Sequence, residues 1–131
     1  MARILLLDDS PLVLTATHDA LEPGGHEVIC TDEPTEFFTA LKTQLPDLAL
    51  VDVSMPTLEG DAVVWIARAH QLHRCAIVLY SAKSEAELAR LVASSGADGF
   101  ICKTSDDGKL RAQVAAFLKH LPGAPSGAAP G

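Results

Sequence analysis

Five polar side chains of the 131-residue chain stand directly after short apolar runs: Asp8, Asp9, Asp52, Ser81 and Lys103. If those runs form parallel strands, their ends meet at one edge of a sheet, and three carboxylates converge on one small pocket. At a separation of about 5 Å and an effective dielectric of ~20, each ionised pair costs roughly 3 kcal/mol. A divalent cation relieves this repulsion, and an all-oxygen ligand set predicts Mg²⁺ or Mn²⁺ rather than zinc.

The same side chains could also hold the charged oxygens of a phosphoryl group. Asp52 is the candidate nucleophile, because a carboxylate can attack phosphorus and form an aspartyl phosphate. Lys103 and a bound cation would neutralise the charge that builds on the transferring oxygens, and Ser81 supplies a hydroxyl donor. The residue types and their order therefore predict a site for phosphoryl chemistry.

The chain alternates short apolar runs with longer segments that have helical periodicity. The runs, which predict strands covered by helices on both faces, are 4–7, 28–30, 48–51, 76–80 and 100–102. Apolar residues at helical spacing follow each run. Five β–α units predict an α/β fold with five helices: a flavodoxin-like, doubly wound, five-stranded parallel sheet in the strand order 2-1-3-4-5.

Composition and charge fit one compact domain over residues 1–121. Apolar residues make up 48% of the chain, and its formal net charge is -7. The basic residues form no run, so we expect no nucleic-acid partner; no apolar stretch approaches membrane-spanning length, so we expect no membrane partner. Residues 122–131 contain only Pro, Gly, Ala and Ser, which predicts a flexible tail or linker.

The three cysteines of the chain have no CxxC spacing. They predict neither a disulfide framework nor a zinc site, and they fit a reducing, cytoplasmic location. Cys30 and Cys102 lie inside apolar runs, and we expect both to be small buried side chains.

The motifs around the polar residues resemble those of the response-regulator receiver family of two-component signalling, in a form similar to chemotaxis regulators. Asp8-Asp9 resembles the acidic pair of the family, and residues 52–60 (Asp-Val-Ser-Met-Pro-Thr-Leu-Glu-Gly) resemble its phosphoacceptor loop. Residues 80–82 (Tyr-Ser-Ala) and 96–103 (Gly-Ala-Asp-Gly-Phe-Ile-Cys-Lys) resemble its fourth- and fifth-strand signatures. The match runs from residue 2 to about residue 121.

The resemblance implies a signalling switch in a phosphorelay that is phosphorylated on Asp52 in a Mg²⁺- or Mn²⁺-dependent reaction. It implies direct metal ligands from Asp9, Asp52 and the backbone carbonyl of Ser54, with Asp8 acting largely through water. Such a domain is regulatory and not an enzyme, because it catalyses at most its own phosphorylation and dephosphorylation. Its phosphodonor would be a histidine kinase or a histidine phosphotransfer protein.

The resemblance also implies how phosphorylation is read. Ser81 and Lys103 would bind the phosphoryl oxygens, the small Ala82 would control access, and Phe100 would be the switch aromatic. A downstream protein would bind the face made by the fourth helix, the fifth strand and the fifth helix. Since no output domain follows in the sequence, we expect a stand-alone receiver, a phosphate shuttle, or a piece separated from a longer chain.

The sequence departs from the family pattern at two positions, and other functions stay open. Thr104 follows Lys103 where the family has proline after a cis bond; without proline a cis bond costs about 3–4 kcal/mol, so the sequence does not fix the loop that aims Lys103. Phe100 lacks the hydroxyl of the commoner tyrosine. The main alternative is a pseudo-receiver that binds proteins independently of phosphorylation. A nucleotide- or flavin-binding domain fits less well, because no G-x-G-x-x-G follows the first run. A phosphohydrolase also fits less well, because Asp52-Val53-Ser54 lacks the second aspartate expected of aspartyl-phosphate hydrolases.

Overall fold

The computed structural model describes residues 2–56 and 58–119 of the chain. The predicted tail at 122–131, and the last two residues of the predicted domain, lie outside the described residues. Within them, strands and helices alternate as follows: β1 (Arg3–Leu7), α1 (Pro11–Leu21), the short 3-10 helix η1 (Glu22–Gly24), β2 (Glu27–Thr31), α2 (Pro34–Thr43), β3 (Leu48–Val51), α3 (Gly60–Ala69), β4 (Ala76–Ser81), α4 (Glu85–Ser95), β5 (Gly99–Cys102) and α5 (Asp107–Lys119).

The five strands form one parallel sheet in the order β2-β1-β3-β4-β5, which confirms the predicted topology. In the register of the central strands, Leu7 lies opposite Val51. The next residues of the chain, Asp8 and Asp52, therefore leave two neighbouring strands at the same edge of the sheet. Strand order is thus the feature that brings the acids together.

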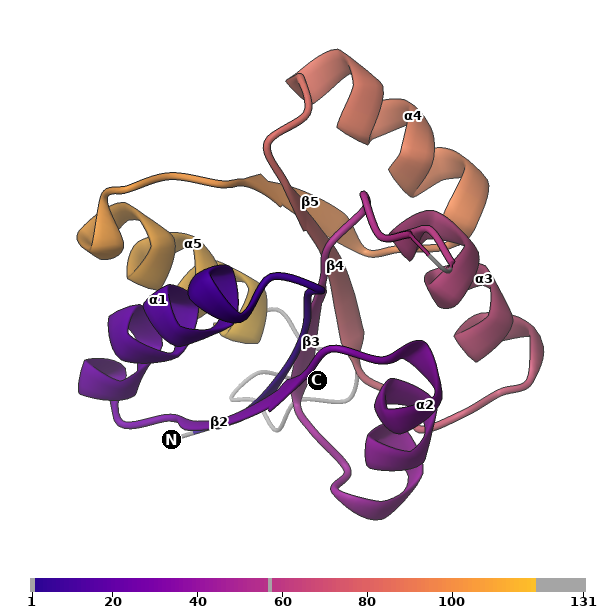
Figure 1. The fold of residues 1–131 in the computed structure, drawn as a ribbon, viewed down its shortest axis with the longest axis horizontal. Coiled ribbons are helices and arrows are strands. Elements are labelled where there is room, and N and C mark those ends of the chain that lie inside the picture. Colours follow the sequence, from indigo (N-terminus) through magenta and orange to yellow (C-terminus); the bar gives the residue numbers. More distant parts are fainter. Residues whose placement is uncertain (1, 57, 120–131) are drawn as a thin grey trace.

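Helices cover both faces of the sheet, with α1 and α5 on one side and α2, α3 and α4 on the other (Figure 1). Because successive side chains of a strand point to opposite faces, each strand contributes to two cores. Leu5, Leu7 and Val51 pack with Phe37 and Leu88 on the side of α2, α3 and α4. A second cluster on the side of α1 and α5 contains Ile4, Leu6, Leu48, Leu50, Val78, Tyr80, Leu21, Leu110 and Val114. This double burial explains why the strand sequences are apolar runs rather than alternating patterns.

Capping residues set the helix boundaries that surround the site. Ser10 is the N-cap of α1, and its side chain accepts a hydrogen bond from Val13 N at 3.3 Å. Pro11 occupies the first turn of that helix, where its missing N–H leaves no bond unmade. At the opposite end of the sheet, away from the site, Gly96 ends α4 with φ 89, a left-handed conformation that suits glycine. None of the helices in the described residues is long and apolar enough to cross a membrane.

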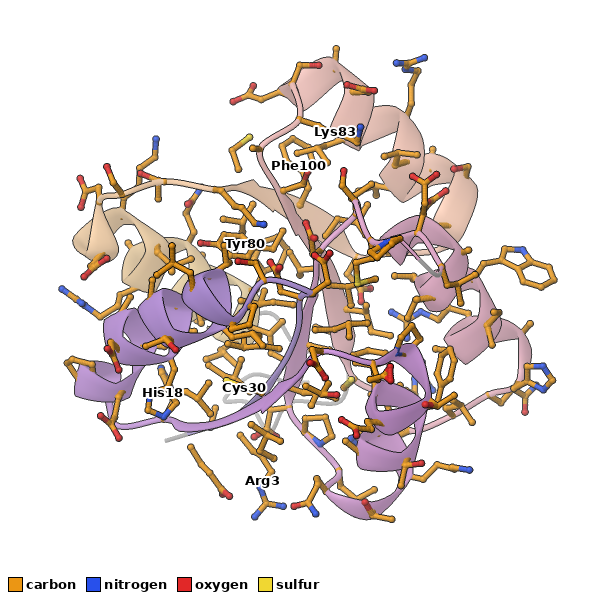
Figure 2. All side chains as sticks on the ribbon, in the orientation of Figure 1. Arg3, His18, Cys30, Tyr80, Lys83 and Phe100 are labelled. Atoms are coloured by element: carbon orange, nitrogen blue, oxygen red, sulfur yellow. The ribbon has the colours of Figure 1, made fainter. Side chains whose placement is uncertain are left out.

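The cysteines differ from the prediction in one case. Cys30 is exposed, Cys102 is partly buried and Cys75 is buried; all three are free. The expectation that Cys30 is buried was wrong, because β2 is an edge strand of the sheet and is covered less completely than the central strands. Cys30 is labelled on this edge in Figure 2.

Candidate functional site

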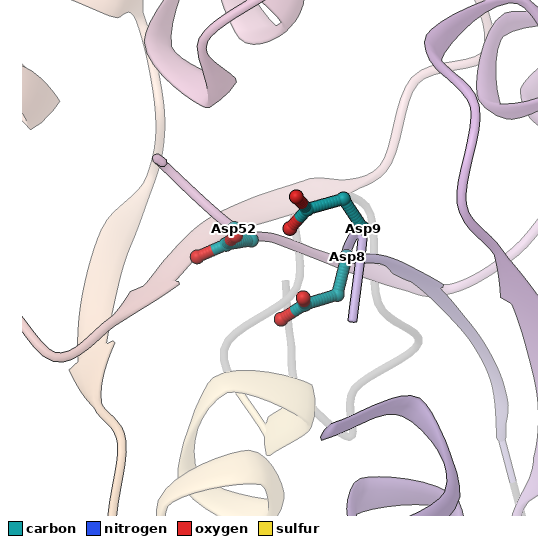
Figure 3. Close-up of side chains that lie close together, drawn as sticks. All are labelled: Asp8, Asp9 and Asp52. Atoms are coloured by element: carbon teal, nitrogen blue, oxygen red, sulfur yellow. The ribbon is translucent and has the colours of Figure 1, made fainter. Parts of the chain in front are cut away.

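Three carboxylates meet at the carboxyl ends of β1 and β3. One side-chain oxygen each from Asp8, Asp9 and Asp52 lies within 4.8 Å of the others (Figure 3). Asp8 and Asp52 are buried, whereas Asp9 is exposed and forms the open side of the group. We call these three residues the acidic site. Its backbone is fixed by the sheet, because Asp52 N donates to Leu7 O at 2.9 Å, one residue beyond the strand.

Lys103 reaches into the acidic site from the end of β5. Its Nζ lies 2.9 Å from Asp8 Oδ2 and 3.2 Å from Asp52 Oδ1. The lysine backbone is anchored on the neighbouring strand, since Lys103 N donates to Ser81 O at 2.8 Å. The predicted inward direction of this side chain is therefore what the structure shows, although Thr104 follows it.

The loop after Lys103 is organised by a side chain. Thr104 Oγ1 accepts a hydrogen bond from Asp106 N at 3.0 Å, which closes a short turn before α5. No cis peptide bond occurs in the described residues, so the Lys103–Thr104 bond is trans. The turn made by Thr104 stands where the family pattern has a proline.

Burial and charge act in opposite directions on the two central groups. Burial raises the pKa of the Asp52 carboxyl; the Lys103 ammonium opposes this rise, and the carboxylate of Asp8 adds to it. Burial alone would lower the pKa of Lys103, but its hydrogen bond to Asp8 and the charge of Asp52 outweigh that effect and raise the pKa. The lysine is therefore held charged, while the Asp52 carboxylate is destabilised by its surroundings.

The donor set of the acidic site fits a hard divalent cation. Three carboxylates against one ammonium leave two negative charges in excess, and every candidate ligand atom is oxygen. Both oxygens of Asp8 already have partners, because Oδ1 accepts from Ser10 N at 2.9 Å and Oδ2 accepts from Lys103. Asp9 and the second oxygen of Asp52 are thus the better placed direct ligands. Ser54 is exposed in the loop after Asp52, and the role of its carbonyl stays a prediction.

The loop after Asp52 folds back tightly onto the strand end. Val53 and Met55 are buried, and Gly60 N donates to Val53 O at 2.9 Å. A Cβ atom at Gly60 would collide with the backbone carbonyl oxygen of Asp52. The glycine at the end of the 52–60 motif is therefore required for α3 to start directly against the backbone of Asp52.

The three remaining predicted residues, Ser81, Ala82 and Phe100, lie on or next to β4 and β5. Ser81 is buried, and its Oγ accepts a hydrogen bond from Lys83 N at 3.2 Å. Ala82 is exposed, so its small side chain leaves the approach to β4 open. Phe100 is partly buried against the core on the side of α2, α3 and α4. Their roles in access and switching stay predictions.

Sequence reasoning missed one residue that touches the site. The ring of Tyr80 lies under the lysine, with its centroid 5.6 Å from Lys103 Nζ. The pairing of strands could have indicated it, because Tyr80 lies opposite Ile101 on β5, two residues before Lys103. Side chains two residues apart on one strand share a face, so an aromatic at this position faces the lysine.

Comparisons with known proteins point to one family. The model of the response regulator receiver domain matches residues 4–115. The alkaline phosphatase synthesis transcriptional regulatory protein PhoP of Bacillus subtilis is 31% identical over 90% of this chain and 49% of its own length. The CAI-1 autoinducer sensor kinase/phosphatase CqsS of Vibrio cholerae is 31% identical over 88% of this chain and 17% of its own length. The chain thus spans half or less of these two relatives.

Solved structures agree on the fold. The Vibrio cholerae chemotaxis protein CheY4 superposes with a TM-score of 0.82 at 22% identity, covering 89% of this chain and 98% of that one. The BeF3-activated DrrB receiver domain superposes with a TM-score of 0.76 at 20% identity, covering 92% and 99%. With the family match over most of the chain and the acids at the expected strand ends, the chain belongs to the response regulator receiver domain family.

Proposed function

We propose that the chain is a phosphoacceptor switch of a two-component phosphorelay, phosphorylated on Asp52 in a Mg²⁺-dependent reaction and read by a protein partner. Receiver domains are regulatory phosphoacceptor modules and not enzymes. The observation that carries the proposal is the geometry of the acidic site. Three carboxylates lie together, a lysine ammonium bonds two of them, Asp8 and Asp52, and the third, Asp9, is exposed to solvent.

Asp52 is the proposed nucleophile. Its Oδ1 pairs with Lys103, which leaves the other oxygen to attack phosphorus. A new P–O bond forms as the bond between phosphorus and the imidazole nitrogen of a donor histidine breaks, and the donor ring, already protonated at its other nitrogen, leaves as a neutral imidazole. Lys103 stays close to the carboxylate and neutralises the oxygens of the incoming group. Ser81, buried at the neighbouring strand end, is the proposed hydroxyl donor to the product.

Asp9, Asp52 and the backbone carbonyl of Ser54 are the proposed metal ligands, with Asp8 acting through water. The excess of two negative charges supports this assignment, because a phosphoryl group adds further negative charge to the same pocket. When bound, Mg²⁺ or Mn²⁺ would supply the positive charge that stabilises the transferring oxygens.

The proposed phosphodonor is a histidine kinase or a histidine phosphotransfer protein, because a receiver domain implies a histidine-kinase partner. Receiver domains generally act in the cytoplasm, and we place this chain there. The proposed reading surface is the face of α4, β5 and α5, which contains Phe100. A movement of Ser81 toward a phosphoryl oxygen would free volume beside β5, and the Phe100 ring could fill it.

The pseudo-receiver alternative has lost its main support. It rested on the presence of Thr104 after Lys103, which left the direction of the lysine open. The Lys103 ammonium lies between Asp8 and Asp52, as a phosphorylated receiver needs. A domain used only as a binding surface would not need a buried carboxylate whose pKa is raised by burial.

Intact mass after incubation with acetyl phosphate and Mg²⁺ tests the proposal. The parent protein should gain one phosphoryl group, and Asp52→Asn should gain none. Asp19→Asn provides the matched control, because it makes the same chemical change at an exposed aspartate of α1. A parent protein that takes no label, or an Asp52→Asn variant that takes as much as the parent, would contradict the assignment.

A further inference from the structure

The Lys103 side chain needs a support that its own loop does not provide. A lysine stem has four rotatable bonds, and Thr104 organises only the backbone that follows it. We propose that Tyr80 is a positioning residue that holds the Lys103 ammonium over the acidic site. This inference rests on the proposed phosphorylation of Asp52, and it adds a residue to which no role in that reaction has been given.

The first support for this inference is the contact between the lysine and the ring. Lys103 Nζ lies 5.6 Å from the centroid of the Tyr80 ring, within the range of a cation–π interaction. Tyr80 is buried and Lys103 is partly buried, so water screens the contact less than it would at the surface. Figure 2 places Tyr80 on the side of the sheet that α1 and α5 cover. The ammonium thus contacts the ring as well as the carboxylates of Asp8 and Asp52.

The second support is the rigidity of the ring. Tyr80 lies within β4 and packs in the cluster that contains Leu21 and Leu110. Thr17, a buried residue of α1, lines the same groove as the Tyr80 side chain. The ring is therefore held by packing between the sheet and α1, whereas the lysine is held at its two ends, by the backbone bond to Ser81 O and by the bonds of its ammonium to Asp8 and Asp52. A fixed ring beside a flexible stem favours the stem conformation that reaches the acids.

The third support is that the Lys103 side chain has an alternative position, in a groove beside the acidic site. A groove of about 450 Å³ between α1 and α5 is lined by Thr17, Tyr80, Lys103, Thr104 and the exposed acid Asp107. A lysine turned into this groove would lie nearer to Asp107 and would leave the acidic site without its cation. The buried ring of Tyr80 forms part of the groove wall, 5.6 Å from the ammonium that bonds the acids. We infer that its attraction for the ammonium favours the position over the acids against the position near Asp107.

NMR of the lysine Hε protons tests the contact directly. A proton held over an aromatic face resonates upfield of a free lysine, so the parent should show one shifted pair that Lys103→Ala removes. Tyr80→Phe keeps the ring and should retain the shift, whereas Tyr80→Leu should lose it. Lysine signals at their free positions in the folded parent would overturn the inference.

The rate of labelling by acetyl phosphate tests the consequence. Tyr80→Leu should label about fivefold more slowly than the parent, a loss equivalent to about 1 kcal/mol, and Tyr80→Phe should stay within about twofold. Phe38→Leu removes a ring on α2 as the matched control and should label at the parent rate. Tyr80→Met serves as a second variant without a ring if Tyr80→Leu folds poorly.

A double-mutant cycle separates positioning from packing. In the Lys103→Ala background, Tyr80→Leu should cause no further slowing, because the ring then has no ammonium to hold. Equal slowing in both backgrounds would mean that Tyr80 acts through the fold, and would overturn the inference. If the parent protein takes no label at all, the proposed function fails instead, and the NMR shift still decides the role of Tyr80.

Discussion

The two ends of the sheet differ in the balance of positive and negative side chains. At the carboxyl end, the acidic site sets three carboxylates against the single ammonium of Lys103. At the amino end, one guanidinium faces one carboxylate, because Arg68 Nη2 lies 2.6 Å from Asp98 Oδ2. The first group is left with excess negative charge, and the second is neutral.

The amino-end group also makes hydrogen bonds to the backbone. Arg68 donates from Nε to Gly96 O at 3.1 Å and from Nη1 to Cys75 O at 3.2 Å. Asp98 Oδ2 accepts a further bond from Ile77 N at 2.8 Å. A side chain of α3 therefore ties together the end of α4 and the starts of β4 and β5. The contrast teaches that balanced charge holds this fold together, whereas unbalanced charge is kept where a ligand can compensate it.

Removal of the guanidinium should have the largest effect on stability. Arg68→Ala breaks a charged pair and leaves two carbonyls without their donor, so we expect a loss of about 2 kcal/mol in the free energy of unfolding. Urea denaturation measures this loss. Labelling of the folded variant by acetyl phosphate should match the parent; a large loss of labelling would mean that the two ends are coupled and that the comparison fails.

Mg²⁺ should stabilise the folded protein through the acidic site at the carboxyl end, and not through the Arg68–Asp98 pair. If the dissociation constant is ~1 mM, 10 mM Mg²⁺ raises the free energy of unfolding by about 1.4 kcal/mol, because only the folded chain presents the acidic site. Asp9→Ala should lose most of this response, and Arg68→Ala should keep it. A melting temperature of the parent that does not move with Mg²⁺ would contradict a metal site.

An aspartate-to-asparagine substitution should change the free energy of unfolding in opposite directions at the two ends of the sheet. Without Mg²⁺ at neutral pH, Asp52→Asn removes a destabilised charge and should stabilise the fold by about 1 kcal/mol. Asp98→Asn removes the partner of Arg68 and should destabilise it by about 1 kcal/mol. Urea denaturation of both variants with EDTA present gives the two values. Changes of the same sign would remove the distinction between the ends.

The pH dependence should give the smallest effect. Because burial raises the pKa of Asp52 above its ordinary value of 3.8, the parent loses stability as pH rises from that value through the pKa of the folded state. The stability advantage of Asp52→Asn should therefore be small near pH ~3 and grow toward pH ~7. Denaturation curves across this range, without Mg²⁺, check the sign; an advantage that shrinks with rising pH would contradict it.

The sequence was sufficient to predict the frame of the site. The run 48–51 coincides with β3, and the other runs identify the remaining strands to within a residue or two at each end. Parallel strands place their carboxyl ends at one edge, so the meeting of Asp8, Asp9 and Asp52 follows from strand order alone. Predicting that these three acids meet required no knowledge of side-chain conformation.

Contacts that depend on side-chain conformation could not be predicted in the same way. The guanidinium of Arg68 and the carboxylate of Asp98 lie 30 residues apart in the chain, and their pairing depends on how α3 packs on the loop before β5. The ring of Tyr80 faces Lys103 only once the register of β4 and β5 is known. The exposure of Cys30 could have been predicted, because the predicted strand order already placed its strand at the edge of the sheet. The apolar run around Cys30 was nevertheless taken as evidence of burial.

The long span between the members of the acidic site has a consequence for synthesis. Asp8 and the lysine that bonds it are 95 residues apart, and Asp52 and the same lysine are 51 apart. During translation, β1 and β3 emerge with their acids well before β5 is made. A nascent chain therefore carries the aspartates without their cation until the last strand has paired. On the proposed function, a chain whose fifth strand has not yet paired would lack the lysine at the acidic site and would not take up the phosphoryl group.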